Sequence, residues 1–146
     1  MLQQVVLGAG VCLANIAIHV VVVAWVVMLA RRLVLAAALA PPFRRLIVVT
    51  GAAAVALMMA HVLEVAVWAT VYALAGVAPG EHPLYFAFVN YTTLGYGDVV
   101  PAAEWRLIGP ITAMNGVLLF GLSTAVLFEV VRTIAQSMHL SPSDAD

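Results

Sequence analysis

Charged side chains are scarce in this chain: they make up 9% of its 146 residues, whereas 65% of the residues are apolar. An ordinary soluble domain is about 25% charged and roughly 45–50% apolar. The chain therefore has too little polar material to cover a water-soluble globule, which excludes a cytosolic enzyme and a disordered protein. The composition predicts a small integral membrane protein whose surroundings are membrane lipid.

The chain also has no lysine and a single cysteine, Cys12. Its net charge of −1 provides no basic field, so no nucleic-acid partner is expected. One cysteine excludes an intrachain disulfide and a metal site built from cysteines. Because Cys12 lies in an apolar run, we interpret it as a small buried hydrophobic residue. We expect neither enzymatic activity nor an organic cofactor.

Three apolar segments exceed the roughly 20 residues that a helix needs to cross a bilayer. They cover residues 2–30, 46–75 and 107–134. The first segment lacks the positive charge that starts a signal peptide and is about twice as long as its apolar stretch, so we interpret it as a retained helix. The predicted fold class is an all-α membrane protein with three transmembrane helices.

The arginines predict the orientation of these helices. Five of the six lie on the same predicted side of the membrane, namely Arg31, Arg32, Arg44, Arg45 and Arg132. The positive-inside rule places residues 31–45 and the C-terminus in the cytoplasm, and the N-terminus and residues 76–106 outside a plasma (inner) membrane. We expect residues 33–40 to form an interfacial helix or to extend the first crossing, and the tail at 137–146 to be a disordered cytoplasmic segment.

The segment between the second and third crossings is not a simple loop. Residues 83–92 are apolar and aromatic, begin with a proline that suits a first helical turn, and are too short to span a bilayer. They predict a short re-entrant helix. The hexapeptide Thr93-Leu94-Gly95-Tyr96-Gly97-Asp98 follows this helix and precedes Pro101.

This arrangement resembles the potassium-channel pore signature, in which a Thr-x-Gly-Tyr-Gly-Asp filter follows a short pore helix. The likeness extends over residues 60–133. The positions that match the spacing of a potassium-channel inner helix and its approach are Trp105-Arg106, Gly116, Phe120-Gly121 and Thr124-Ala125.

The resemblance implies a domain organisation and an assembly. Residues 1–45 would be an N-terminal transmembrane helix with its connection, and 46–136 a pore domain. Within the pore domain, the pore helix would be 83–92, the selectivity filter 93–98 and the inner helix 105–134. The resemblance also implies a homotetramer around one axial pore, with K⁺ ions in the filter.

The filter residues suit ion binding for reasons of backbone chemistry. Gly95 and Gly97 allow dihedral angles that are closed to other residues, so that successive carbonyls can face one axis. The carbonyls of Thr93, Leu94, Gly95 and Tyr96, with the Thr93 hydroxyl, would replace the water shell of a dehydrated cation. Ligand sets made only of oxygen suit a hard cation.

Several side chains are candidates for supporting the filter. Asp98 is interpreted as a cation attractor and brace, with a plain surface carboxylate as the alternative. Tyr96 is expected to wedge against Tyr85 and Phe86.

Two positions depart from the family pattern. Leu94 stands where many members carry Val or Ile. Val89 stands where some carry a glutamate that pairs with the filter aspartate. Trp105 is then the candidate hydrogen-bond donor to Asp98.

The third crossing carries the candidates for pore lining and gating. We expect Phe120 and Thr124 to line an inner cavity. Gly116 is interpreted as a gating hinge, with close helix packing as the alternative, and Gly121 as a packing residue. Ser123 is a candidate for a hydrogen bond to its own helix.

Polar side chains also occur inside the first two crossings. Asn15 and His19 lie one helical turn apart, as do His61 and Glu64. Counted from the cytoplasmic arginines, a rise of about 1.5 Å per residue puts Asn15 and His61 at similar depth and Glu64 roughly 4–5 Å further out. We therefore expect the two helices to face each other through these groups, with Glu64 near the back of the pore helix. The cluster is interpreted as structural hydrogen bonding or as a pH sensor.

The predicted function is a potassium-selective channel subunit that conducts K⁺ passively as a homotetramer. No crossing carries arginine at every third position, so we expect no voltage sensor. Gating is expected to come from pH, lipid tension or an unidentified regulatory partner. The alternatives are a weakly selective monovalent cation channel and a non-conducting regulatory subunit. A secondary transporter is disfavoured because no internal repeat is visible.

Overall fold

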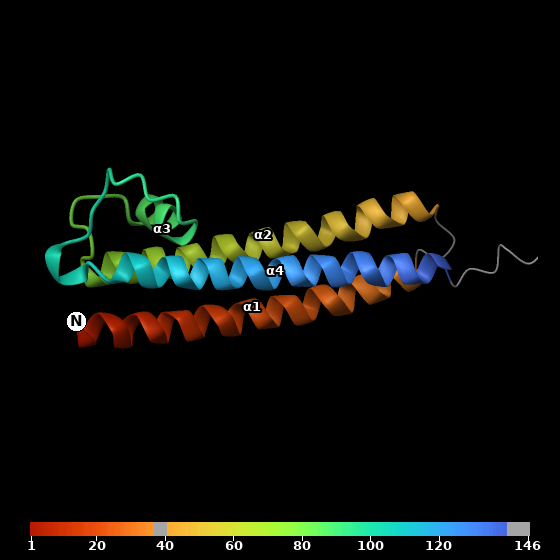
Figure 1. The fold of residues 1–146 in the computed structure, drawn as a ribbon, viewed down its shortest axis with the longest axis horizontal. Helices are drawn as coiled ribbons and strands as arrows, with labels where there is room; N and C mark the ends of the chain where they lie inside the picture. Colours follow the sequence, from red (N-terminus) through yellow and green to blue (C-terminus); the bar gives the residue numbers. More distant parts are fainter. Residues whose placement is uncertain (37–40, 140–146) are drawn as a thin grey trace, which may run out of the picture.

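The computed structural model describes residues 1–36 and 41–139, and every secondary-structure element in these residues is a helix. Three long helices run side by side, namely α1 (Leu2–Ala36), α2 (Pro42–Ala75) and α4 (Ile108–His139) (Figure 1). The short helix α3 (Pro83–Tyr91) packs against α2 and α4, and the 3₁₀ turn η1 (Ala103–Trp105) leads into α4. Within the described residues, three helices are long and apolar enough to cross a membrane, which confirms the predicted fold class.

At the arginine-rich end of the bundle, the end of α1 and the start of α2 differ from the prediction. α1 continues through Arg31 and Arg32 to Ala36, because long arginine side chains can reach water from within a helix. The first crossing is therefore extended as far as Ala36, and residues 37–40 lie outside the described part of the chain. α2 begins at Pro42 rather than at Leu46, because the first turn of a helix needs no amide hydrogen from proline.

At the end of the bundle where α3 lies, the end of α2 agrees with the prediction and the start of α4 differs from it. α2 stops at Gly76 as predicted, and this residue takes the left-handed conformation (φ 62°, ψ 39°) that closes a helix. The inner helix was predicted from residue 105, but Trp105 belongs to η1 and α4 begins at Ile108. α4 continues to His139, and the rest of the predicted tail, residues 140–146, lies outside the described part.

The interior of the bundle consists of two apolar layers with a polar layer between them. The layer near α3 centres on Trp68, Tyr72, Phe86 and Ile108. The other layer joins α1, α2 and the end of α4 through Val26, Val49, Leu57, Val130 and Ile134. Residues that lie between these layers along each helix include the buried Asn15, His19, Glu64, Asn115 and Ser123.

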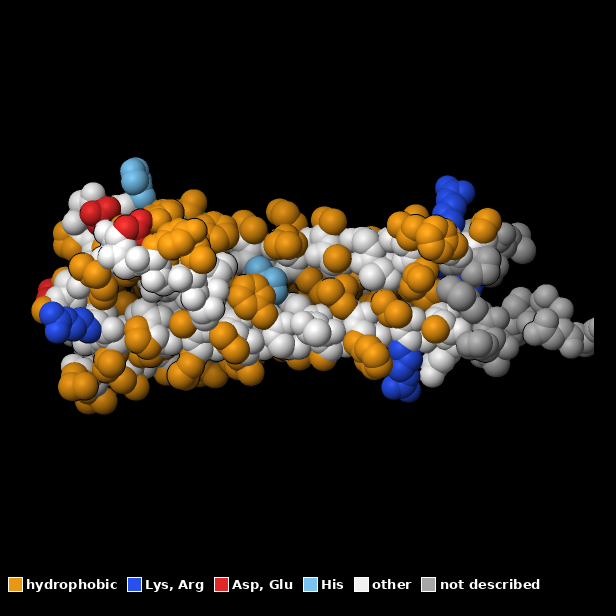
Figure 2. Space-filling view, turned by 45° about the horizontal axis from the view of Figure 1, so that its top comes forward, with side chains coloured by type: hydrophobic (Ala, Val, Ile, Leu, Met, Phe, Trp, Pro, Cys, Tyr) orange, Lys and Arg blue, Asp and Glu red, His pale blue; other side chains and the backbone are white. Residues whose placement is uncertain are grey.

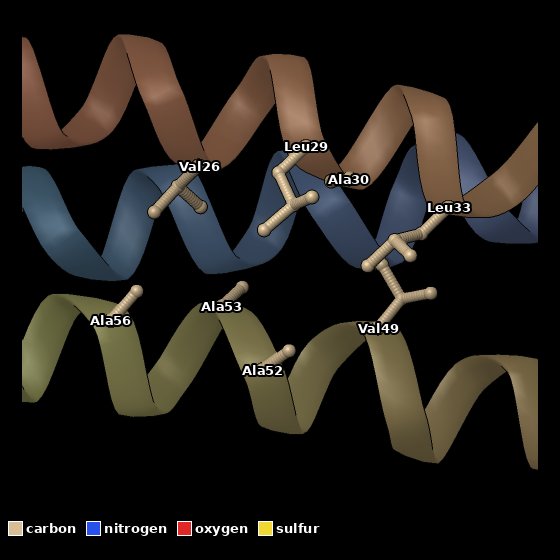
Figure 3. A pocket seen from close by; sticks show the side chains of 8 residues that line it. All are labelled: Val26, Leu29, Ala30, Leu33, Val49, Ala52, Ala53 and Ala56. Atoms are coloured by element: carbon tan, nitrogen blue, oxygen red, sulfur yellow. The ribbon is translucent and has the colours of Figure 1, made fainter.

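Small side chains let α1 and α2 approach closely in the second apolar layer. Ala52, Ala53 and Ala56 of α2 face Val26 and other branched residues of α1 across a narrow apolar pocket (Figure 3). Alanine at such positions favours van der Waals packing between helices, which is the main attraction available inside a membrane.

The outer surface of the bundle is apolar along most of its length, and the charged side chains on the face in Figure 2 gather near its two ends. Exposed apolar side chains include Leu13, Val21, Val55, Met58 and Leu118. The N-terminus lies at the same end as α3, and Ala36 lies at the opposite end with the end of α4 (Figure 1). The first long helix therefore begins at one end of the bundle and the third finishes at the other, as three crossings of a membrane require.

Candidate functional site

The chain turns back on α3 as soon as that helix ends. The amides of Thr92, Thr93 and Leu94 donate to the carbonyls of Phe88, Asn90 and Val89, each over 3.0 Å. The Gly95 amide also donates to the Val89 carbonyl, over 3.3 Å. The first four residues after α3 thus use their amides to satisfy the carbonyls that a helix leaves free at its C-terminus.

The carbonyls of the strip have no such partners. Among the described residues, no hydrogen-bond donor reaches the carbonyl oxygens of residues 93–96. A backbone carbonyl requires a partner wherever water is excluded. Residues 93–97, which we call the carbonyl strip, therefore present oxygen atoms that are free to bind something outside this chain.

The sign of φ alternates along the carbonyl strip. It is positive at Thr93 (60°), Gly95 (58°) and Gly97 (78°), whereas Leu94 and Tyr96 do not have positive values. Such alternation allows successive carbonyls to lie on one side of an extended chain, and it is easiest with glycine at every second position. The positive φ at Thr93 was not predicted, because a β-branched residue adopts this conformation only at a cost.

The strip is bare within a single chain. All residues from 92 to 98 are exposed, including Leu94 at 52% and Tyr96 at 68%. Tyr96 was expected to wedge against Tyr85 and Phe86. Phe86 is only 2% exposed, and its ring centroid lies 5.3 Å from that of Tyr72. The wedge of Tyr96 stays a prediction.

The outer end of the strip is tied back to the start of α3. The Tyr85 hydroxyl donates to Asp98 Oδ2 over 2.5 Å, and the Val99 amide donates to Asp98 Oδ1 over 3.1 Å. The hydrogen bond to Asp98 raises the pKa of Tyr85. The donor to Asp98 is thus Tyr85 rather than Trp105, because η1 holds the Trp105 side chain in the apolar layer near α3.

Behind α3, four polar side chains form a closed ring of hydrogen bonds. Glu64 is at its centre: Oε1 lies 2.8 Å from His19 Nδ1, and Oε2 lies 3.0 Å from His61 Nδ1. Ser123 Oγ lies 2.9 Å from His61 Nε2 and 3.2 Å from His19 Nε2, which closes the ring. We call His19, His61, Glu64 and Ser123 the histidine ring.

Tyr91 joins the histidine ring to α3. Its hydroxyl donates to Glu64 Oε2 and lies 3.0 Å from His61 Nδ1. Tyr91 is the last residue of α3 and stands two positions before the carbonyl strip. The ring therefore contacts all four helices at the level where the strip begins.

Asn15 belongs to a second group of hydrogen bonds beside the ring. Its Nδ2 donates to the Glu64 carbonyl over 3.3 Å and to Asn115 Oδ1 over 3.0 Å. The Trp68 indole donates to the same Asn115 oxygen over 3.0 Å. The four polar residues predicted in the first two crossings therefore lie together between α1 and α2.

Sequence reasoning missed three members of this polar layer, namely Tyr91, Asn115 and Ser123. Ser123 was expected to bond to its own helix, but it contacts both histidines instead. Asn115 and Ser123 lie eight residues apart, which places them on one face of α4. That spacing was the signal in the sequence that could have identified the third helix of the polar layer.

Within one subunit, Gly116 and Gly121 of α4 have different surroundings, and close packing, the alternative considered for Gly116, is what the structure shows there. A Cβ added to Gly116 would overlap the carbonyl oxygen of Tyr91 and lie 3.0 Å from its carbonyl carbon, so Gly116 is a position of close packing. A Cβ on Gly121 would meet no atom of the chain within 4 Å.

The two candidates for cavity lining, Phe120 and Thr124, are both exposed in the single chain. The Thr124 hydroxyl donates to the Phe120 carbonyl over 3.0 Å. The Phe120 ring lies 4.6 Å from the His61 ring and 5.4 Å from the Tyr91 ring, measured between centroids. Phe120 therefore packs beside the His61 and Tyr91 members of the polar layer.

Comparison with known proteins agrees with this architecture. No curated protein and no solved structure matches the chain. A family model described as "Ion channel" matches residues 46–133, which include most of α2, α3, the carbonyl strip and most of α4. Because this match covers more than half of the sequence, the chain belongs to this ion channel family, whose two-helix pore unit is like that of potassium channels.

Proposed function

We propose that the protein is a potassium-selective channel subunit that conducts K⁺ passively as a homotetramer. The observation that carries the proposal is the carbonyl strip. It follows a short helix, four of its carbonyl oxygens accept no hydrogen bond among the described residues, and the sign of φ alternates from residue to residue. K⁺ is the transported ion, and no catalytic step or organic cofactor is needed for its passage.

The choice of K⁺ rests on the oxygen ligands and on the strip sequence. Backbone carbonyls are neutral, hard ligands, and rings of them can replace the hydration shell of a monovalent cation. The strip keeps the Gly95-Tyr96-Gly97 core of the signature that the sequence resembles. This core favours a K⁺-selective pore rather than a weakly selective one.

The assembly of several copies is supported by what one chain leaves uncovered. Non-helical backbone at membrane depth is stable only where protein covers it or it lines a watery path. One subunit leaves residues 92–98 exposed. α4 also exposes a stripe with the 3.5-residue spacing of a helix–helix seam: Met114, Leu118, Gly121, Ala125 and Phe128. Four copies around an axis would cover both features.

The orientation follows from the charges at the two ends. We place the end with Arg31, Arg32, Arg44, Arg45 and Arg132 in the cytoplasm, and the N-terminus and α3 outside a plasma (inner) membrane. Asp98 and Glu104 then lie near the outer mouth, where carboxylates would attract cations.

Purified protein in liposomes tests the proposal. With a K⁺ gradient and a potential-sensitive dye, we expect flux that stops when Na⁺ or a large organic cation replaces K⁺. Reversal potentials in mixed K⁺ and Na⁺ should shift by tens of millivolts toward the K⁺ equilibrium potential. A reversal potential near zero would indicate the weakly selective alternative, and absence of flux from correctly assembled protein would indicate a non-conducting subunit.

The bond between Tyr85 and Asp98 predicts a loss of selectivity. In Tyr85→Phe, the outer end of the strip loses its tie to α3, so we expect the ratio of K⁺ to Na⁺ permeability to fall several-fold. The matched comparison is a double-mutant cycle with Asp98→Asn. The double variant should be no less selective than Tyr85→Phe alone, and additive losses would show that the two side chains act independently.

A further inference from the structure

The histidine ring has one hydrogen-bond link more than its protons can fill. Each of its four links needs one proton: two between Glu64 and the Nδ1 atoms, and two between Ser123 and the Nε2 atoms. An ionised Glu64 supplies none, and each neutral imidazole and Ser123 supply one. Three protons therefore serve four links, and one additional cation, a proton on an imidazole or a metal ion, would complete the ring.

The charge of Glu64 leads to the same requirement. Its side chain is fully buried in a membrane-spanning helix, where an uncompensated carboxylate is costly. Among the described residues, its ionic partners are His19 and His61, and no arginine lies within ion-pair distance of it. The compensating positive charge can therefore come from a protonated imidazole or from a metal ion bound by the ring.

We propose that the histidine ring binds one divalent transition-metal ion of the Zn²⁺ class. The ligands are His19 Nδ1, His61 Nδ1 and a carboxylate oxygen of Glu64. One donor atom from each of these residues lies within 4.8 Å of the other two. Two imidazoles and a carboxylate form a donor set that proteins use for Zn²⁺, and the Tyr91 hydroxyl beside Glu64 supplies an oxygen for a fourth position.

Ser123 provides the second observation that points to a metal. When both Nδ1 atoms bind an ion, each imidazole keeps its proton on Nε2. Ser123 Oγ lies within hydrogen-bond distance of both Nε2 atoms and has two lone pairs, so it can accept both protons. A metal-bound histidine usually donates its second N–H to such an oxygen. The metal thus gives all four imidazole nitrogens a partner.

An ion would reach the ring from the side covered by Phe120. His19 and Glu64 are fully buried, but the His61 side chain keeps 11% of its surface exposed. The Phe120 ring stacks on His61 and is itself 36% exposed. Rotation of Phe120 about its side-chain bonds would open this path without moving a helix. The bound ion would link α1 to α2 directly, and to the end of α3 through Tyr91.

Metal titration of the purified protein tests this proposal, and it does not depend on conduction. Protein in detergent is stripped with a chelator, dialysed and titrated with Co²⁺, then with Zn²⁺. We expect one Co²⁺ per subunit, with the strong visible absorption of a tetrahedral site, and its displacement by Zn²⁺. X-ray absorption of the Zn²⁺ form should show two imidazole nitrogens and additional oxygen ligands.

Variants separate the ring from other histidines. His19→Gln and His61→Gln should each weaken Zn²⁺ binding by more than about 100-fold, and Ser123→Ala by roughly 10–100-fold because it removes the outer partner of both imidazoles. The matched control is His82→Ala, since His82 is exposed beside α3. Wild-type protein that binds no Co²⁺ or Zn²⁺ would overturn the proposal, because an extra proton would then complete the ring. Equal binding by wild type and both glutamine variants would also overturn it.

Discussion

Gly95→Ala is expected to abolish K⁺ flux while leaving the amount of assembled protein unchanged. Gly95 has a φ of 58°, a conformation that costs an alanine roughly 1–2 kcal/mol. A Cβ at this position would meet only the Thr93 carbonyl oxygen, 4.0 Å away, so the expected effect is conformational and not steric. The alanine would therefore shift the strip toward arrangements in which its carbonyls no longer face one axis.

The predicted effect is large because it is multiplied by the number of subunits. Four strips in one pore would together lose roughly 4–8 kcal/mol of preference for the conducting arrangement, or about three to six powers of ten in its population. Flux into liposomes, measured beside size-exclusion profiles of the same preparations, separates this effect from loss of assembly.

The matched control for Gly95→Ala is Gly51→Ala. Gly51 lies within α2, has an ordinary helical conformation and has no atom within 4 Å of an added Cβ. We expect flux through this variant to equal that of the wild type. Wild-type flux through Gly95→Ala would contradict the assignment of residues 93–97 as the ion-binding strip.

Gly116→Ala is expected to destabilise the protein and to disturb the start of the carbonyl strip. The added Cβ would overlap the carbonyl of Tyr91, which cannot move without displacing the end of α3. Excess volume at a packed position costs about 1–3 kcal/mol, and more where backbone must shift. We expect a lower melting temperature in detergent, together with loss of flux.

Gly51→Ala is again the matched control, because Gly121 belongs to the proposed seam between copies. A Cβ at Gly51 meets open space, and alanine favours a helix over glycine by roughly 1 kcal/mol in soluble proteins. The melting temperature of the subunit should be unchanged or higher. If Gly116→Ala melted at the wild-type temperature, α3 and α4 would not be in the close contact described above.

The sequence was sufficient to predict features that depend on the composition of long segments. Apolar length predicted the three long apolar helices, and Gly76 and Pro83 predicted the end of α2 and the start of α3. Local chemistry at helix ends was less predictable. Arg31 and Arg32 do not stop α1, because a cationic side chain ends the contact with hydrocarbon without ending the backbone hydrogen bonds.

Contacts between helices were predictable only where two polar residues shared one helix face. The pair of His61 and Glu64 predicted a polar face of α2, and Asn115 with Ser123 marks one on α4, but neither spacing indicates that Ser123 contacts both histidines. The roles of Gly116 and Gly121 depend on whether the backbone of another element passes within a few ångströms. That distance is a property of tertiary packing, so spacing along α4 could not distinguish the two glycines.

The position of the polar layer also has a consequence for how the protein enters the membrane. A charged side chain at the centre of a lone helix opposes insertion by roughly 2.5–3.5 kcal/mol, and α2 carries Glu64 at such a position. α1 is synthesised first and brings Asn15 and His19, which are the groups that bond to Glu64 and its backbone. α1 would therefore lower the cost of inserting α2 by offering partners to Glu64, and Ser123 of α4 would complete the layer when that helix follows.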